Sequence, residues 1–250
     1  MKRISLIVPC LNEEEAIPAF KQEIDRVFKE CLEGYAPELI FVDDGSTGRS
    51  LEMIKKMAEH SPEVKFISFS RNFGKEAAIY AGLEAATGDY AAVMDVDLQD
   101  PPSLLPDMLK AIEKEGYDCA GTRRVTRQGE PLLRSFFARA FYKTIHQISN
   151  TRIVDGARDY KLMTRPVLEA LLSLKEYNRF SKGLYEWVGF RTKWFEYENV
   201  ERVAGETKWS FFKLFLYSIE GIVAFSTAPL ALASIMGVLL PSSHSFPSLS

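Results

Sequence analysis

Metal-binding cysteine pairs are missing from this sequence of 250 residues. Its three cysteines lie far apart and form no Cys-x-x-Cys pair, so we expect neither a structural zinc site nor a disulfide framework. They are Cys10, Cys31 and Cys119. A reducing compartment is therefore the default. The net charge is only −3, which gives no reason to expect nucleic acid as a partner.

Motifs of three common enzyme classes are missing as well. No Gly-x-Gly-x-x-Gly follows the first predicted strand, and no Gly-x-x-x-x-Gly-Lys-Ser/Thr occurs, which argues against a nicotinamide-dependent enzyme and a P-loop ATPase. Gly-x-Ser-x-Gly, the nucleophile elbow of α/β-hydrolases, does not occur either. The first apolar run is short and ends in acids, unlike a signal peptide. We therefore expect a buried strand over Ile4–Val8.

Strand and helix patterns alternate up to Thr122. The predicted strands are ISLIVP, ELIFVDD, VKFISFS, YAAVMDVD and YDCAGT, and the predicted helices between them are Glu14–Glu30, Ser50–Glu59, Lys75–Ala86 and Pro102–Glu115. Continuous apolar runs of this kind are typical of a parallel sheet that helices cover on both faces. Right-handed crossovers then predict a doubly wound, Rossmann-like α/β fold that binds a nucleotide.

The chain after Thr122 is more basic and aromatic. We expect helices at Pro131–Ile148 and Ser210–Phe225, and the apolar content of the second predicts docking on a membrane surface. Gly221–Leu240 is uncharged and has roughly the 20 residues that a membrane span needs, but Pro229 interrupts it. The predicted division is a catalytic domain over 1–205, an amphipathic juxtamembrane helix over 206–228, a partial transmembrane segment over 229–240 and a disordered tail over 241–250.

The sharpest local pattern is DVDLQDPP, which begins at Asp95 and follows an apolar strand. Two carboxylates two residues apart, beside the amide of Gln99, form a set of hard oxygen ligands that suits Mg²⁺ or Mn²⁺ on a diphosphate. The alternative is an acidic loop that caps the helix after it. At the end of another predicted strand, Asp43 and Asp44 precede Gly45, where acids can bind a ribose, although Asp-Gly-Ser is also good turn chemistry.

Six segments occur in an order that resembles a known family: IVPCLNEEEAI, FVDDGSTG, SFSRNFGKEAAIYAGLEAATGD, VMDVDLQDPP, ARDYKLMTR and VAGETKWS. Together they resemble a family-2 glycosyltransferase of the polyprenyl-phosphate type, the group of the bactoprenol glucosyltransferases and dolichol-phosphate mannose synthases. The resemblance covers about Arg3–Leu240. It implies a GT-A fold, a nucleotide-sugar donor, a divalent metal and a lipid-phosphate acceptor.

The resemblance also implies roles for particular residues. The donor would be bound by Pro9, Leu11, Glu13, Asp43, Asp44, Asp95, Val96, Gln99, Arg202 and Lys208. The metal, Mg²⁺ or Mn²⁺, would be held by Asp95, Asp97 and Gln99, and the catalytic residues would be Asp97, Arg123 and Asp159. The sequence departs from the family pattern at three positions: Leu11 stands where tyrosine is frequent, Gly48 follows Thr47 where aspartate is usual, and Arg158 stands where glycine is usual.

The reaction implied is transfer of a hexose from a nucleotide diphosphate to a polyprenyl phosphate, with UDP-glucose as the favoured donor. A phosphate acceptor is anionic at neutral pH, so Asp159 is expected mainly to orient it. The implied location is the cytoplasmic face of the cell's inner membrane, and a homo-oligomer is possible by family analogy. Two alternatives stay open: a glycosyltransferase with a sugar-hydroxyl acceptor, and a truncated, non-catalytic module attached to the membrane.

Overall fold

The computed structural model describes residues 1–124, 154, 156–177, 179–197, 223 and 225–239. The predicted helix at Pro131–Ile148 lies outside these residues, as do the predicted site residues Arg202 and Lys208. Of the predicted helix at Ser210–Phe225, only residues 223 and 225 are described. The predicted tail over 241–250 also lies outside the described residues.

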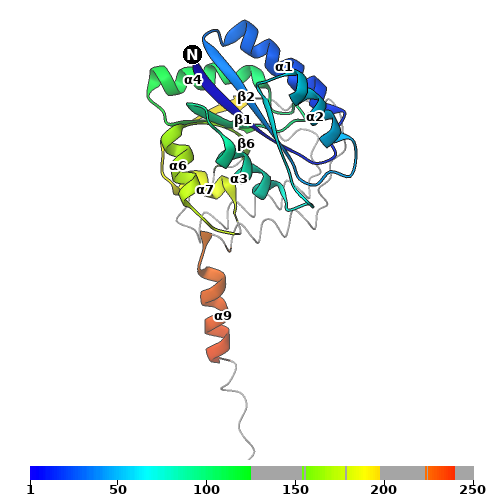
Figure 1. Ribbon diagram of the computed structural model, residues 1–250. Helices are drawn as coiled ribbons and strands as arrows, with labels where there is room; N and C mark the ends of the chain where they lie inside the picture. The colour runs from blue at the N-terminus through cyan, green and yellow to red at the C-terminus, as the bar shows by residue number, and fades with distance from the viewer. Residues whose placement is uncertain (125–153, 155, 178, 198–222, 224, 240–250) are drawn as a thin grey trace, which may run out of the picture.

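In the described residues, one sheet contains seven strands in the order β3-β2-β1-β4-β6-β5-β7 (Figure 1). Their bounds are β1 Lys2–Cys10, β2 Tyr35–Asp43, β3 Val64–Ser68, β4 Tyr90–Val93, β5 Cys119–Arg124, β6 Ala157–Thr164 and β7 Thr192–Tyr197. β1 is parallel to β2 and β4, β2 is parallel to β3, and β5 is parallel to β7. The predicted α/β fold is confirmed.

One strand departs from the predicted parallel sheet. β6 lies between β4 and β5 and is antiparallel to both. β6 follows β5 in the chain and runs in the opposite direction, so the rule for parallel strand–helix–strand units does not apply to it. The consequence is that β6 begins at the sheet edge where β1, β2 and β4 end.

The two faces of the sheet follow from the alternation of side chains along its strands. In β1, Ile4, Leu6 and Val8 belong to one apolar core, and Ile7 belongs to the other. The first core lies under α1 (Ala16–Cys31), α2 (Ser50–His60) and α4 (Leu105–Glu115). The second lies under α3 (Lys75–Ala85), α6 (Arg165–Ser173) and α7 (Ser181–Trp187), and a short 3₁₀ turn, η1 (Pro102–Leu104), precedes α4.

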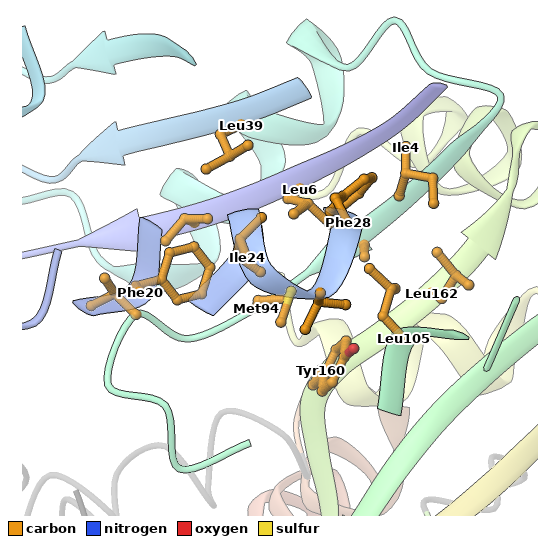
Figure 2. Packing of buried hydrophobic residues seen from close by; sticks show 14 of the residues in the cluster. Ile4, Leu6, Phe20, Ile24, Phe28, Leu39, Met94, Leu105, Tyr160 and Leu162 are labelled. Atoms are coloured by element: carbon orange, nitrogen blue, oxygen red, sulfur yellow. The ribbon is translucent and has the colours of Figure 1, made fainter. Parts of the chain in front are cut away.

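Figure 2 shows how the first core is built on α1. Phe20, Ile24 and Phe28 are four residues apart, so they lie on one face of the helix and point at the sheet. Full burial of such a side chain contributes about 1.5–3 kcal/mol. They belong to one core with apolar side chains of β1 and with Tyr160 of β6, which is fully buried. This packing fixes the sheet whose edge carries the polar site.

The end of the described chain is α9 (Ala228–Leu239), which extends away from the sheet and its helices (Figure 1). The helix begins next to Pro229 and is not interrupted by it, because proline is tolerated in the first turn. Several large side chains of α9 are exposed: Leu230, Ile235 and Met236. Within the described ranges, none of the helices combines the length and apolar character needed to cross a membrane.

Candidate active site

The loops after β1 and β2 are tied together by Asn12. Its side-chain oxygen accepts hydrogen bonds from the backbone N–H groups of Thr47 at 2.8 Å and Gly48 at 3.2 Å. The backbone N–H of Asn12 donates to Ser46 Oγ at 2.9 Å, and the residue has a positive φ of 51°. Asparagine tolerates this left-handed conformation better than most residues. Asn12 thus sets the shape of this part of the edge.

The half-buried residues Pro9, Leu11 and Glu13 lie on the same segment as Asn12. Pro9 is in β1 opposite Val42 of β2, and the backbone N–H of Glu13 donates to Ser50 Oγ at 2.8 Å. The structure therefore brings the three predicted donor residues to the edge that also carries Asp43. Their contact with a nucleotide stays a prediction.

Asp43 is the last residue of β2 and Asp44 follows it, and both are almost fully buried. Asp44 accepts hydrogen bonds from the backbone N–H groups of Phe73 at 2.7 Å and Gly74 at 3.0 Å, so it holds the loop between β3 and α3. Asp43 accepts a long hydrogen bond, 3.4 Å, from the N–H of Ser46. Both acids organise loops at this edge of the sheet, and their predicted contact with the base and ribose stays a prediction.

The acidic loop follows β4, which ends at Val93, earlier than predicted. Val96 is buried, Asp95 is partly exposed, and Asp97 Oδ1 accepts a hydrogen bond from the backbone N–H of Gln99 at 3.1 Å. Leu98 between them has a positive φ of 57°, which costs energy for a bulky side chain and persists where the surroundings enforce it. The surroundings therefore hold the loop in a fixed conformation, with its two carboxylates two residues apart.

The metal-binding capacity of this loop can be judged from its ligands. Among the described residues, no three acidic, histidine or cysteine side chains converge on one point. Asp95 and Asp97 instead offer carboxylate oxygens, and Mg²⁺ in such sites is held by one or two carboxylates while phosphates and waters complete the shell. Asp95 already accommodates a cation, the ammonium of Lys75, at 2.6 Å. The residues present therefore fit a divalent metal shared with a diphosphate.

Asp159 is brought to this loop by the antiparallel pairing of β6 with β4. Val93 pairs with Lys161, so two residues further along the pair Asp95 comes beside Asp159. Lys75 joins them: its Nζ lies 2.6 Å from Asp95 Oδ1 and 2.5 Å from Asp159 Oδ2. Lys182 of α7 lies 4.0 Å from the other oxygen of Asp159. Two acids and two lysines therefore form one charged cluster.

The charges of this cluster decide the protonation of Asp159. Burial would raise the pKa of its carboxyl, but the ammonium groups of Lys75 and Lys182 outweigh burial and hold that pKa well below its usual range. Burial likewise opposes the charge of Lys75, while Asp159 and Asp95 keep the pKa of its ammonium above the usual value. Asp159 is therefore an ionised carboxylate and a weak base.

Another acid of this loop, Asp100, is buried and connects the loop to β6 and β7. Its Oδ1 accepts a hydrogen bond from Arg158 Nε at 3.0 Å and another from the hydroxyl of Tyr197 in β7. Burial raises the pKa of the Asp100 carboxyl, and the positive charge of Arg158 opposes that shift. Arg158, the residue that stands where the family has glycine, thus pairs with the acidic loop next to Asp159.

The described contacts do not connect the predicted basic residues Arg123, Arg202 and Lys208 with the two acids. Arg123 in β5 lies opposite Glu196 in β7, and its Nη2 forms an ion pair with that carboxylate. Within the described part of the chain, no hydrogen bond or ion pair joins Arg123 to Asp95 or Asp159, and its Nε is buried without a partner. Arg202 and Lys208 lie outside the described residues. Phosphate contacts by these three residues stay predictions.

Sequence reasoning missed Lys75, Lys182 and Asp100 as members of the site. Lys75 had one usable signal, because it directly follows Gly74 at the start of a helix, just after a strand of the ligand edge. Asp100 lies in the same DVDLQDPP segment as the predicted metal ligands, and its burial was the unpredicted property. Lys182 had no local signal, because only the fold brings α7 to Asp159.

The chain was compared with models of known protein families. The model described as "Glycosyl transferase family 2" matches residues 5–172, which run from within β1 through most of α6. The chain belongs to glycosyltransferase family 2. It is an enzyme of the hexosyltransferase kind, and its mixed sheet is that of the Rossmann-like GT-A fold.

Relatives of this family-2 enzyme extend the match almost to its C-terminus. The prophage bactoprenol glucosyl transferase homolog of Escherichia coli (strain K12) is 41% identical over 240 residues, which cover 96% of this chain and 78% of the relative. The bactoprenol glucosyl transferase of Shigella phage SfV is also 41% identical over 240 residues, covering 96% of this chain and 77% of the relative. The resemblance to the polyprenyl-phosphate group is thereby confirmed.

Two solved structures share the fold of this family-2 enzyme. A mannosyltransferase from Pyrobaculum calidifontis in complex with GDP-Man and Mn²⁺ aligns with a TM-score of 0.53 and 19% identity, over 98% of this chain and 77% of that one. Glucosyl-3-phosphoglycerate synthase from Mycobacterium tuberculosis in complex with Mn²⁺, UDP-Glc and phosphoglyceric acid aligns with a TM-score of 0.53 and 21% identity, over 87% of this chain and 76% of that one. At these identities the likeness extends to the fold alone.

Proposed function

We propose that this enzyme transfers glucose from UDP-glucose to a polyprenyl phosphate, with inversion at C1 of the sugar. The observation that carries the proposal is the 41% identity to bactoprenol glucosyl transferases over 96% of the chain. The geometry agrees with it, because the acidic loop and Asp159 converge at the sheet edge where ligands bind in open α/β sheets.

The donor end of the site is formed by the loops after β1, β2 and β4. Pro9, Leu11 and Glu13 line one side of the nucleotide, and the loops that Asp43 and Asp44 hold line the other. Asp95, Asp97 and Gln99 would hold Mg²⁺ or Mn²⁺ at the diphosphate. When bound, the metal neutralises the charge that develops on the departing nucleoside diphosphate. The buried Val96 keeps the two carboxylates in position.

The acceptor end is formed by Asp159 and the basic groups near it. An oxygen of the acceptor phosphate forms a bond to C1 of glucose while the bond from C1 to the UDP oxygen breaks, which gives UDP and glucosyl polyprenyl phosphate. The phosphate has a second pKa of about 6, so at neutral pH it attacks as an anion and needs no strong base. Arg123, Arg202 and Lys208 neutralise the phosphates of donor and acceptor.

The low pKa of Asp159 fits an orienting role better than a proton-accepting one. A general base is most effective when its pKa lies near the working pH. The carboxylate of Asp159 is instead held ionised between Lys75 and Lys182. In that state it orients the positive groups around it, so that the acceptor oxygen is aligned behind C1 of the sugar, and alignment of the reacting atoms is a large part of such catalysis.

The membrane side of the proposal rests on the C-terminal segments. The division into a catalytic domain over 1–205, a juxtamembrane helix over 206–228, a partial transmembrane segment over 229–240 and a tail over 241–250 stands as a proposal. Exposed apolar side chains on α9, such as Leu230 and Ile235, favour contact with lipid at the cytoplasmic face of the inner membrane. A homo-oligomer is part of the same proposal.

A transfer assay tests this function directly. The purified chain is incubated with Mn²⁺ or Mg²⁺, short-chain polyprenyl phosphate and radiolabelled UDP-glucose, with GDP-mannose and UDP-N-acetylglucosamine as competing donor candidates. We expect label from UDP-glucose in the lipid phase, and none when the metal is chelated. Polyprenol without phosphate is the matched acceptor control.

Other outcomes distinguish the remaining hypotheses. Transfer to a sugar hydroxyl and not to polyprenyl phosphate would contradict the lipid acceptor. Donor binding with metal but no transfer to any acceptor would favour a non-catalytic membrane-attached module. Label from another donor would keep the reaction and replace glucose.

A further inference from the structure

Lys75 connects the acidic loop with β6 through a single ammonium group. Its Nζ lies 2.6 Å from Asp95 Oδ1 and 2.5 Å from Asp159 Oδ2, and the side chains involved are between a fifth and a third exposed. Contacts this short between opposite charges that are partly withdrawn from water are stronger than those of an exposed surface pair. Lys75 is therefore the shared counter-ion of a predicted metal ligand and of the predicted orienting acid.

The position of Lys75 in its helix argues against a role in helix stability. It is the first residue of α3, directly after Gly74, whose φ is 97°. Helix N-termini carry partial positive charge, so a cation there is unfavourable and an acid is favourable. The second residue, Glu76, is of the favourable kind. The charge of Lys75 therefore destabilises the helix start. Among the described contacts, its ion pairs with the two carboxylates are what offsets this cost.

We propose that Lys75 is a positioning residue with two linked effects: it competes with a divalent cation for Asp95, and it holds Asp159 in its catalytic orientation. The proposal deepens the proposed function, because it takes Asp95 as a metal ligand and Asp159 as the orienting acid. The ammonium and a divalent cation are alternative counter-ions of Asp95. Asp159 keeps Lys75 as its partner in either case.

The two effects have opposite signs when Lys75 is removed. Without its ammonium, Asp95 and Asp159 face each other as two carboxylates, and a carboxylate pair attracts a divalent cation more strongly. Binding of the cation alone therefore becomes tighter. Transfer becomes slower, because Asp159 loses the bond that orients it. If Lys75 only stabilised the fold, its removal would weaken cation binding and slow transfer together.

Lys182 provides a matched control within the same cluster. Its Nζ lies 4.0 Å from Asp159 Oδ1, and in the described part of the chain it forms no ion pair with Asp95. Its side chain is 23% exposed, close to the 32% of Lys75. Removal of Lys182 takes the same charge from Asp159 and leaves the partner of Asp95 in place.

The test is a titration of the purified chain with Mn²⁺ alone. Electron paramagnetic resonance measures the concentration of the free ion at each step. We expect Lys75→Met to bind Mn²⁺ about fivefold more tightly than the wild type, the effect of losing one partly exposed competing ion pair. Lys182→Met shifts the affinity less than Lys75→Met, and Lys75→Arg, which keeps the charge, stays close to the wild type. At saturating Mn²⁺ and donor, kcat of Lys75→Met falls at least about tenfold.

The Mn²⁺ titration needs neither donor nor acceptor, so its result does not depend on the outcome of the transfer assay. If Lys75→Met binds Mn²⁺ no more tightly than the wild type, including the case in which neither binds, the competition is refuted. The same holds if Lys75→Arg binds as tightly as Lys75→Met, because the charge then has no effect. Tighter binding with an unchanged kcat refutes the orienting role.

Discussion

Arg158 and Asp100 form a buried ion pair between β6 and the acidic loop, with 3.0 Å between Arg158 Nε and Asp100 Oδ1. The carboxylate of Asp100 is 1% exposed, and its Oδ2 has no hydrogen-bond partner in the described part of the chain. The pair fixes the loop that carries Asp95 and Asp97 to the strand that carries Asp159. The residue that departs from the family pattern thus has a structural role at the site.

We expect Arg158→Ala to destabilise the protein because, among the described residues, it leaves the buried carboxylate of Asp100 with Tyr197 as its one partner. Loss of one partner of a buried pair costs about 3–5 kcal/mol, and the partial exposure of Arg158 reduces that to about 2–3 kcal/mol here. Urea unfolding measures the change. The double variant Arg158→Ala/Asp100→Ala should recover part of the loss, since no buried charge then remains. A double variant as unstable as the sum of both single variants would contradict a direct interaction.

Substitution of Gly45 tests the backbone of the loop after β2, which we propose lines the nucleotide. The φ of Gly45 is 73°, and a Cβ at this position would lie 2.4 Å from the carbonyl carbon of Arg71. Gly116, with the same φ of 73°, has open space around such a Cβ and is the matched control. We expect Gly116→Ala to lose about 1 kcal/mol from its left-handed backbone, and Gly45→Ala to lose more and to raise KM for UDP-glucose several-fold. Thermal unfolding and donor saturation curves measure both. Equal losses in the two variants would show that the contact with Arg71 is unimportant.

The sequence predicts the first half of the site well because each of its parts is local. An apolar strand followed by Asp43 or Asp95 places an acid at the carboxyl edge of a parallel sheet, whatever the rest of the fold does. Asp159 was found only through the resemblance to the family. Its meeting with Asp95 depends on an antiparallel strand that pairs with β4 from far along the chain, and local patterns do not determine such pairing.

The unpredicted parts of the site are those that depend on burial. A lysine at a helix start, such as Lys75, has the usual appearance of a solvated surface residue, and only the neighbouring strands turn it toward two acids. Asp44 was predicted to contact the nucleotide because acids at strand ends often do. The structure adds that it holds the Phe73–Gly74 backbone. One carboxylate can serve as a loop anchor or a ligand group, and its residue type does not distinguish the two.

Glu38 should contribute to the loss of stability at low pH. This carboxylate is 3% exposed and accepts hydrogen bonds from Lys65, Ser5 and Thr87. Burial would raise its pKa, but these donors lower it from 4.5 to about 2. A carboxyl whose pKa is lower in the folded state contributes stability above the unfolded pKa and loses it as the pH falls through the folded one. The free energy of unfolding should therefore fall between about pH 5 and pH 2, by up to about 3 kcal/mol from this group.

Glu38→Gln tests that assignment. The amide keeps the shape of the side chain and cannot titrate, so the variant should be less stable at neutral pH and should lose less stability on acidification. Urea unfolding at several pH values between 2 and 7 measures the slope. Glu30→Gln, on the exposed surface of α1, makes the same substitution outside this buried cluster and is the control. An unchanged slope in Glu38→Gln would assign the acid sensitivity to other carboxylates.

Asp97 gives the sharpest test of the acidic loop, because asparagine preserves the hydrogen bond that the backbone N–H of Gln99 donates to its Oδ1. We expect Asp97→Asn to fold with little change in stability and to lose at least about a hundredfold in kcat/KM, since it removes one anionic oxygen ligand of the metal. Asp107→Asn, on the exposed side of α4, makes the same change of charge away from the site and should keep full activity. Mn²⁺ titration and glucosyl transfer are measured on both. If Asp97→Asn transfers glucose normally and binds Mn²⁺ as the wild type does, then Asp95 and Gln99 suffice for the metal, and the buried Asp97 is a structural acid of the loop.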